Sequence, residues 1–84
     1  MIPAHTKAAL DRYVNHRLQP GGFLTAVLSN DLFSAVAQAD SENRRALADI
    51  VVYIYNNIPG DAWGSRDTVW QWCESKFYEQ VAQS

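Results

Sequence analysis

The sequence predicts a compact all-α bundle of about five helices, two of them short, in a single domain spanning residues 1–84. Apolar segments with helical periodicity follow capping residues, and short polar turns separate these segments without any internal repeat. The composition is typical of a globular protein, with 48% hydrophobic and 12% aromatic residues. At 84 residues, the chain is long enough to bury a core without disulfides or metals.

The first segment is predicted to form a helix from about Pro3 to His16. Proline suits the first helical position, because its missing N–H would have no intrahelical partner there. One side of this helix is expected to face the core, and it carries Thr6, Leu10, Tyr13 and Val14. The turn "QPGG" then ends the helix.

Two short helices are expected next, in "GFLTAVLS" and "LFSAVAQA". The first is apolar almost all round, which predicts burial against several neighbours. Asn30 or Asp31 can end it and cap the second, because their side-chain oxygens accept hydrogen bonds from free N–H groups.

A longer helix, "SENRRALADIVVYIYNNI", is expected after a cap at Asp40 or Ser41. The run "IVVYIY" is also compatible with a buried strand, because β-branched and aromatic residues favour strands. A helix is preferred, since the start is capped and the periodic segment spans about 17 residues, which is long for a strand. The expected buried face consists of Leu47, Ile50, Val51, Ile54, Tyr55 and Ile58.

The last helix, "RDTVWQWCESKFYEQVAQ", is expected to start after a cap at Ser65. Its predicted apolar face consists of Val69, Trp70, Cys73, Phe77 and Val81. Trp72 falls about 200° from Trp70, so the two rings cannot both be central to one core face. Trp72 either packs at the margin of the core, beside Val69 or under the first helix, or belongs to an interface.

Surplus aromatic residues on a small protein are typical of an interface, either with a second copy of the chain or with another protein. Val52, on the polar side of the fourth segment, adds to this apolar surplus. The residues predicted to contact a partner are Trp63, Trp72, Tyr78, Arg44 and Arg45.

The turn at Gly21 and Gly22 has two interpretations. The favoured one is a helix terminator with positive φ at one glycine, followed by a tight restart. The alternative is a nucleotide-binding site, in which an anion meets free N–H groups at the helix start. Arg17 would then add charge, and Phe23 or Tyr13 would stack on a base. The turn matches neither nucleotide-binding glycine motif, and no strand precedes it.

The remaining reactive side chains do not form a catalytic or metal-binding set. His5 and His16 lie roughly 16 Å apart along one helix, too far to share a metal ion, and both are expected on the surface. Cys73 is expected to be a small core residue rather than a nucleophile, which needs an adjacent base. We therefore expect no enzymatic activity, metal or cofactor.

Charge and hydropathy limit the classes of partner. Seven basic and nine acidic residues give a net charge of −2, whereas nucleic-acid binders normally carry a basic surplus. A small DNA-binding regulator is a further alternative, with only Arg12, Arg17, Arg44 and Arg45 to form its basic face. No signal sequence or membrane span is recognised, and the single cysteine fits a reducing compartment, so a cytoplasmic location is expected.

The run "IPAHTKAALDRYVNHRLQPGGFLTAVLSNDLFSAVAQADSENRRAL", with "YNNIP" and "WGS" further on, resembles a family of short proteins encoded by phages, prophages and mobile elements. The likeness covers roughly residues 2 to 72, and the tail from Glu74 is longer than the family pattern. No activity of the family is established, so the resemblance implies a setting. Small phage proteins commonly bind and block host systems, which suggests an antagonist of host defence such as CRISPR–Cas.

Overall fold

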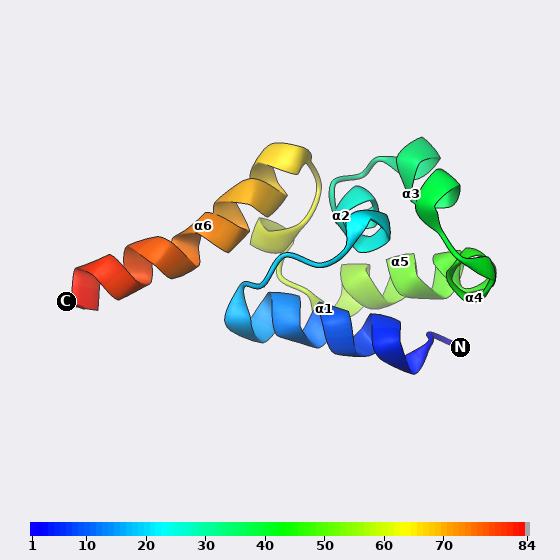
Figure 1. Cartoon of the computed structure of the whole chain (residues 1–84), viewed down its shortest axis with the longest axis horizontal. Coiled ribbons are helices and arrows are strands. Elements are labelled where there is room, and N and C mark those ends of the chain that lie inside the picture. The colour runs from blue at the N-terminus through cyan, green and yellow to red at the C-terminus, as the bar shows by residue number, and fades with distance from the viewer. Residues whose placement is uncertain (84) are drawn as a thin grey trace.

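Within residues 1–83 the chain forms six α-helices and one 3-10 turn, and this part contains no strand. This computed structural model describes the backbone of residues 1–83 and the side chains of residues 1–75. The predicted all-α bundle is confirmed (Figure 1). The elements are α1 (Ala4–His16), α2 (Gly22–Leu28), α3 (Leu32–Gln38), α4 (Ser41–Arg45), α5 (Leu47–Asn57), η1 (Gly60–Ala62) and α6 (Arg66–Gln83).

Three helices begin at side-chain caps that the sequence predicts. The Ser34 N–H donates to Asp31 at 3.2 Å, and the Asn43 N–H donates to Asp40 at 2.8 Å. The Ser65 hydroxyl accepts from the Thr68 N–H at 3.1 Å. Each cap satisfies one of the backbone donors that a helix start leaves unpaired, which fixes where α3, α4 and α6 begin.

The predicted helix from Ser41 to Ile58 is divided into α4 and α5 by a bend at Ala46. This residue has φ −93° and ψ 3°, outside the helical range. Helical hydrogen bonding nevertheless continues across it, because its N–H donates to Glu42 and its carbonyl accepts from Ile50. The segment therefore differs from the predicted single helix by a bend at one residue.

The core forms where α1, α2 and α5 meet. Leu10, Tyr13 and Ile50 are completely buried, and Leu28 is 1% exposed. Figure 1 shows α6 running from this body toward the opposite end of the molecule from the N-terminus. Because α6 projects in this way, the molecule is elongated and measures 44 × 22 × 20 Å along its three principal axes.

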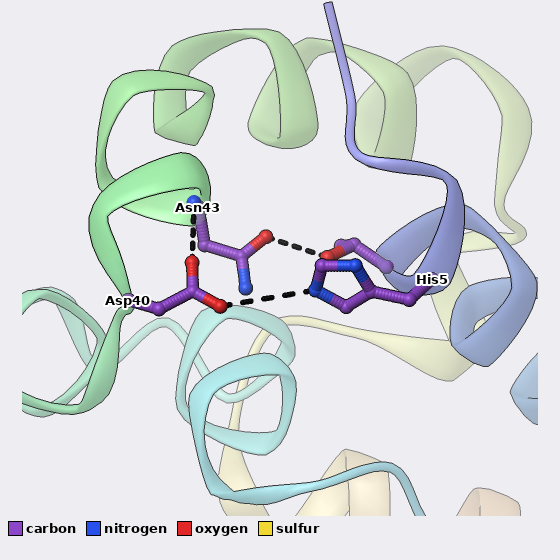
Figure 2. Close-up of polar contacts among 4 residues, drawn as sticks. His5, Asp40 and Asn43 are labelled. Atoms are coloured by element: carbon purple, nitrogen blue, oxygen red, sulfur yellow. Dashed lines mark hydrogen bonds and ion pairs between the residues drawn. The ribbon is translucent and has the colours of Figure 1, made fainter.

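A polar junction joins the start of α1 to α4 (Figure 2). The Thr6 hydroxyl donates to the Asn43 side-chain oxygen at 2.5 Å, and both side chains are buried. His5 lies 3.8 Å from the Asp40 carboxylate, and both of these side chains are largely exposed to solvent. The buried hydrogen bond satisfies two polar groups that would otherwise destabilise the interior.

We expect Asp40→Ala to lower the free energy of unfolding by about 1 kcal/mol, because the variant leaves the first turn of α4 without its cap. Asp40→Asn is the matched control, since an asparagine keeps the capping oxygen and removes only the exposed ion pair with His5. Such pairs contribute at most about 1 kcal/mol. Urea unfolding of the two variants checks this, and equal losses would show that the cap contributes nothing.

Candidate protein-binding surface

Neighbouring faces of α3 and α5 leave large apolar side chains in water. On α3 the exposed fractions are 60% for Leu32, 89% for Phe33 and 38% for Val36. Within that helix these three residues span an arc of about 100°, which continues from the buried Ala35.

A similar arc of about 100° runs along α5, beside the buried Ile54. Its exposed fractions are 47% for Val51, 57% for Val52 and 72% for Tyr55. The apolar face of α5 is therefore wider than the core beneath it can cover. The prediction that Val51 and Tyr55 belong to the buried face is wrong, because both are exposed and only the side of this helix that carries Ile50 and Ile54 is buried in the core.

A groove of about 190 Å³ lies between the two helices. Apart from Asn30 and Asp31, its lining residues are hydrophobic: Val27, Leu32, Ala35, Leu47, Val51, Ile54, Tyr55 and Trp63. We call the exposed residues of α3 and α5, together with Trp63 and this groove, the α3–α5 surface.

Trp63 lies at the groove, in the loop after η1. Its indole N–H donates to the Ile58 carbonyl at 3.1 Å, and its ring centroid lies 5.9 Å from that of Tyr55. Both contacts hold the half-buried ring in place. Of the residues that the sequence predicts to contact a partner, Trp63 is the one that the structure places on the α3–α5 surface.

The charged residue that lines the groove is Asp31, and it is already paired. Arg66 donates to its carboxylate at 2.6 Å, and the Ser34 N–H donates to the same group. The hydrogen bond from Arg66, followed by those from Ser34, lowers the pKa of Asp31 below its usual value. The pair gives this edge of the groove a salt bridge without net charge.

The α3–α5 surface is large for a chain of this size. With aromatic side chains of about 150–250 Å² and somewhat smaller aliphatic ones, the six exposed residues of α3 and α5 present on the order of 600 Å². The largest apolar patch on a typical monomer covers about 300–600 Å², and such patches are often functional. Sequence reasoning missed Leu32, Phe33 and Val36, although five of the seven residues of α3 are hydrophobic.

Trp72 and Trp70 exchange the roles expected from the sequence. The Trp72 indole N–H donates to the Tyr13 carbonyl at 2.9 Å, and its ring centroid lies 6.3 Å from that of Tyr13. Trp72 therefore packs against the first helix, the alternative left open for it. Trp70 is 62% exposed, so its predicted place on the core face of α6 is wrong.

Arg17 also belongs to this contact between α1 and α6. Its guanidinium carbon lies 3.6 Å from the centre of the Trp72 ring, a cation–π distance. The same guanidinium donates to the Trp72 carbonyl at 3.5 Å and to the Ser75 hydroxyl. The nucleotide-binding alternative requires the Arg17 guanidinium at the glycine turn, whereas in the structure this group contacts α6.

The structure gives the glycine turn a different conformation from the predicted one. Helix α1 ends with Arg17 at φ 58°, whereas Gly21 has φ −64°, so the positive φ predicted at a glycine is wrong. At this left-handed position the Arg17 N–H donates to the Tyr13 carbonyl at 3.1 Å and the Leu18 N–H to the Arg12 carbonyl at 3.5 Å, which closes the end of the helix. A Cβ atom at Gly22 would meet only the end of the exposed Gln38 side chain, which can move aside, so this contact does not require a glycine.

The hollow beside this turn does not resemble an anion site. Gly21, Gly22 and Phe23 line it together with the carboxylate-bearing Asp40, which would repel a phosphate. Phe23 is 9% exposed and packs in the core, leaving little of its ring to stack on a base. Arg17 is not among the lining residues of this hollow.

The other predicted site residues lie apart from one another. Arg44 and Arg45 are exposed on α4, and Tyr78 lies outside the residues whose side chains the structure describes. Burial raises the pKa of the Cys73 thiol, which favours the unreactive protonated form. Across the described residues, no group of three or more potential metal ligands is present.

Within the same part of the chain, no helix combines the length and apolar character needed to cross a bilayer. Comparison of the chain with protein-family models, with curated proteins and with solved structures gave no match.

Proposed function

We propose that this chain is a non-enzymatic binding protein that acts on another protein through the α3–α5 surface. The observation that carries the proposal is the set of exposed apolar side chains on α3, where Phe33 is 89% exposed and its neighbour Leu32 lines the apolar groove. Full burial of such a side chain is worth about 1.5–3 kcal/mol. A partner that covered it would gain this free energy on binding.

The shape of the groove favours a helical segment of the partner. The groove runs between two helices and is lined almost entirely by apolar side chains, with its edge charge neutralised by the pair Asp31–Arg66. An amphipathic helix can lay its apolar face into a groove of this kind. Arg44 and Arg45 are exposed on α4, which directly precedes α5, but neither residue lines the groove.

The resemblance of the sequence to proteins of phages and mobile elements suggests where the partner is found. We propose that it is a host protein, and that binding blocks a defence complex such as CRISPR–Cas. The proposal assigns no catalytic role to Thr6, whose hydroxyl is used in a buried hydrogen bond, or to Cys73, whose pKa is raised by burial.

A phage plating assay tests this function in a host whose CRISPR–Cas system restricts the test phage. We expect the wild-type chain to restore plating and to co-purify with the effector complex. Phe33→Asp should lose both effects, because it places a charge at the centre of an apolar contact. Trp70→Ala is the matched control, since it removes an exposed ring from a different face and should retain both.

Two results would contradict the proposal. Plating that stays restricted in the presence of the wild-type chain would reject the defence complex as the target. Equal co-purification by the wild-type and Phe33→Asp chains would reject the α3–α5 surface as the binding site.

A further inference from the structure

A hollow of about 370 Å³ lies between the start of α1, the glycine turn before α2 and the start of α4. We infer that this hollow binds a hydroxyl group of a sugar, either a free sugar or the ribose of a nucleoside. It shares no lining residue with the groove of the α3–α5 surface, so the site is independent of the proposed function.

The base of the hollow carries the side-chain amide of Asn43. This residue lines the hollow although only 7% of it is exposed. Its amide oxygen accepts from the Thr6 hydroxyl, and Figure 2 shows its amide nitrogen between the Asp40 carboxylate and the His5 imidazole. Among the residues whose side chains are described, no hydrogen-bond acceptor pairs with this nitrogen. Buried polar groups are normally paired, so the amide nitrogen is a donor suited to a ligand.

The rim of the hollow is formed by two more polar groups, from Asp40 and His5. The carboxylate oxygen Oδ2 of Asp40 lies 3.8 Å from the imidazole Nε2 of His5. This separation is too long for a direct hydrogen bond, but an oxygen atom about 2.8 Å from each of them fits between them. The other carboxylate oxygen, Oδ1, accepts from the Asn43 N–H as the cap of α4, so Oδ2 is the one that can receive a proton donor from a ligand.

These three groups match the hydrogen-bonding capacity of a hydroxyl, which donates one bond and accepts two. A ligand hydroxyl donates to Asp40 and accepts from the amide of Asn43 and the imidazole of His5. A carbonyl oxygen has no proton for the carboxylate, and an ammonium group has no lone pair for the amide. A phosphate is repelled by Asp40, and the described residues that line the hollow include no lysine or arginine to offset this repulsion.

The remaining walls suit a sugar ring better than a simple alcohol. Ala9, Phe23 and Leu24 line the hollow with apolar atoms, against which the C–H groups of a sugar ring can pack. Gln38 also lines it, and its side-chain amide can both donate to and accept from a neighbouring hydroxyl. Small-molecule sites typically measure about 300–1,000 Å³ and combine an apolar lining with a few convergent polar groups. The hollow has both properties.

Titration of the ¹⁵N-labelled chain, followed by NMR, tests this site. The probes are the methyl α-glycosides of glucose, galactose and mannose, together with adenosine and guanosine. We expect at least one probe to shift the side-chain NH₂ resonances of Asn43 saturably, with a dissociation constant in the millimolar range. A response to the glycosides identifies a free sugar as the ligand. A response to the nucleosides alone identifies ribose, provided that 2′,3′-dideoxyadenosine, which lacks the vicinal hydroxyls, gives none.

Variants of the rim show whether the polar groups act as assigned. Asp40→Asn keeps the capping oxygen of α4 but replaces the carboxylate, so it should weaken sugar binding by at least about 10-fold, as expected for a hydrogen bond to a charged group. His5→Ala should weaken binding by a smaller factor. Asp31→Asn is the matched control, because Asp31 caps α3 in the same way and does not line the hollow. It should bind like the wild type, and circular dichroism should show that all three variants keep their helices.

Three results would overturn this site. They are the absence of a saturable shift at Asn43 with every probe, binding by Asp40→Asn that equals binding by the wild type, and binding of 2′,3′-dideoxyadenosine as tight as that of adenosine. Each of them leaves the α3–α5 surface untouched. Conversely, a failure of Phe33→Asp to lose the host target would leave the sugar site unaffected.

Discussion

Replacing Tyr13 by alanine is expected to lower the free energy of unfolding by about 3–5 kcal/mol, the usual range for truncating a buried aromatic residue. Tyr13 is completely buried, and its ring packs against Trp72. Its hydroxyl donates to the Ala62 carbonyl at 2.7 Å. The substitution opens a cavity at the junction of α1, η1 and α6, and this loss is a large share of the stability of a small domain.

Tyr13→Phe isolates the hydroxyl group. We expect it to cost about 1–2 kcal/mol, because the buried Ala62 carbonyl loses its donor. Tyr55→Phe is the matched control, since Tyr55 is 72% exposed and its loss should be close to zero. Urea unfolding monitored by circular dichroism measures both, and equal losses at the two positions would contradict the assigned role of Tyr13.

The burial of Tyr13 also predicts a dependence on pH. Burial raises the pKa of this phenol far above its usual value near 10, because the charged form is poorly solvated inside the protein. The stabilisation is complete below pH 10 and is lost progressively above it, where the unfolded chain ionises first. Above pH 10 the stability of Tyr13→Phe should therefore fall less steeply with pH than that of the wild type.

The second large effect is expected at Trp72. Trp72→Ala should lower the free energy of unfolding by about 2–4 kcal/mol, somewhat less than for a fully buried tryptophan, because Trp72 is only partly buried. The variant removes the hydrogen bond to the Tyr13 carbonyl and the ring beneath the Arg17 guanidinium. These contacts hold α6 against α1.

Trp70→Ala is the natural comparison, two residues away on the same helix. Its ring is 62% exposed, so we expect a change within about 0.5 kcal/mol. Thermal unfolding of the two variants gives the comparison directly. A larger loss for Trp70→Ala than for Trp72→Ala would mean that α6 presents its other side to α1.

The helices themselves could be predicted from local chemistry. Asp31, Asp40 and Ser65 stand immediately before their helices, and a capping oxygen acts on backbone groups only two or three residues away. The bend at Ala46 has no such local signal, because hydrogen bonding continues across it. To predict the bend at Ala46, one would need to know the tertiary contacts of α4 and of α5.

Which tryptophan is buried could not be predicted, because hydrophobic residues span about 160° of the circumference at the start of α6, with the two tryptophans at its edges. Val69, Trp70, Trp72 and Cys73 leave its rotation open, and the contact with Tyr13 decides it. The positive φ at Arg17 could not be predicted either, since the glycines of the turn are the residues that favour this conformation.

The candidate surface was predicted in part. The aromatic surplus indicated Trp63, which is half-buried and lines the groove. The exposed rings of the described residues include Phe33, Tyr55 and Trp70, which the sequence did not indicate as surface. The two helical faces were not recognised, because an apolar stripe that meets a core and one that meets solvent have the same sequence pattern. Only the exposed fractions in the structure show that Val51 and Tyr55 stay uncovered.

The link between Tyr13 and the far end of the chain has a consequence for the order of events during synthesis. Tyr13 depends on Ala62 and Trp72, which follow it by 49 and 59 residues. These partners are still untranslated, or inside the ribosome, when α1 emerges. The Tyr13 side chain on the first helix therefore stays exposed until α6 has left the ribosome. We expect the domain to fold cooperatively only after most of the chain has been made.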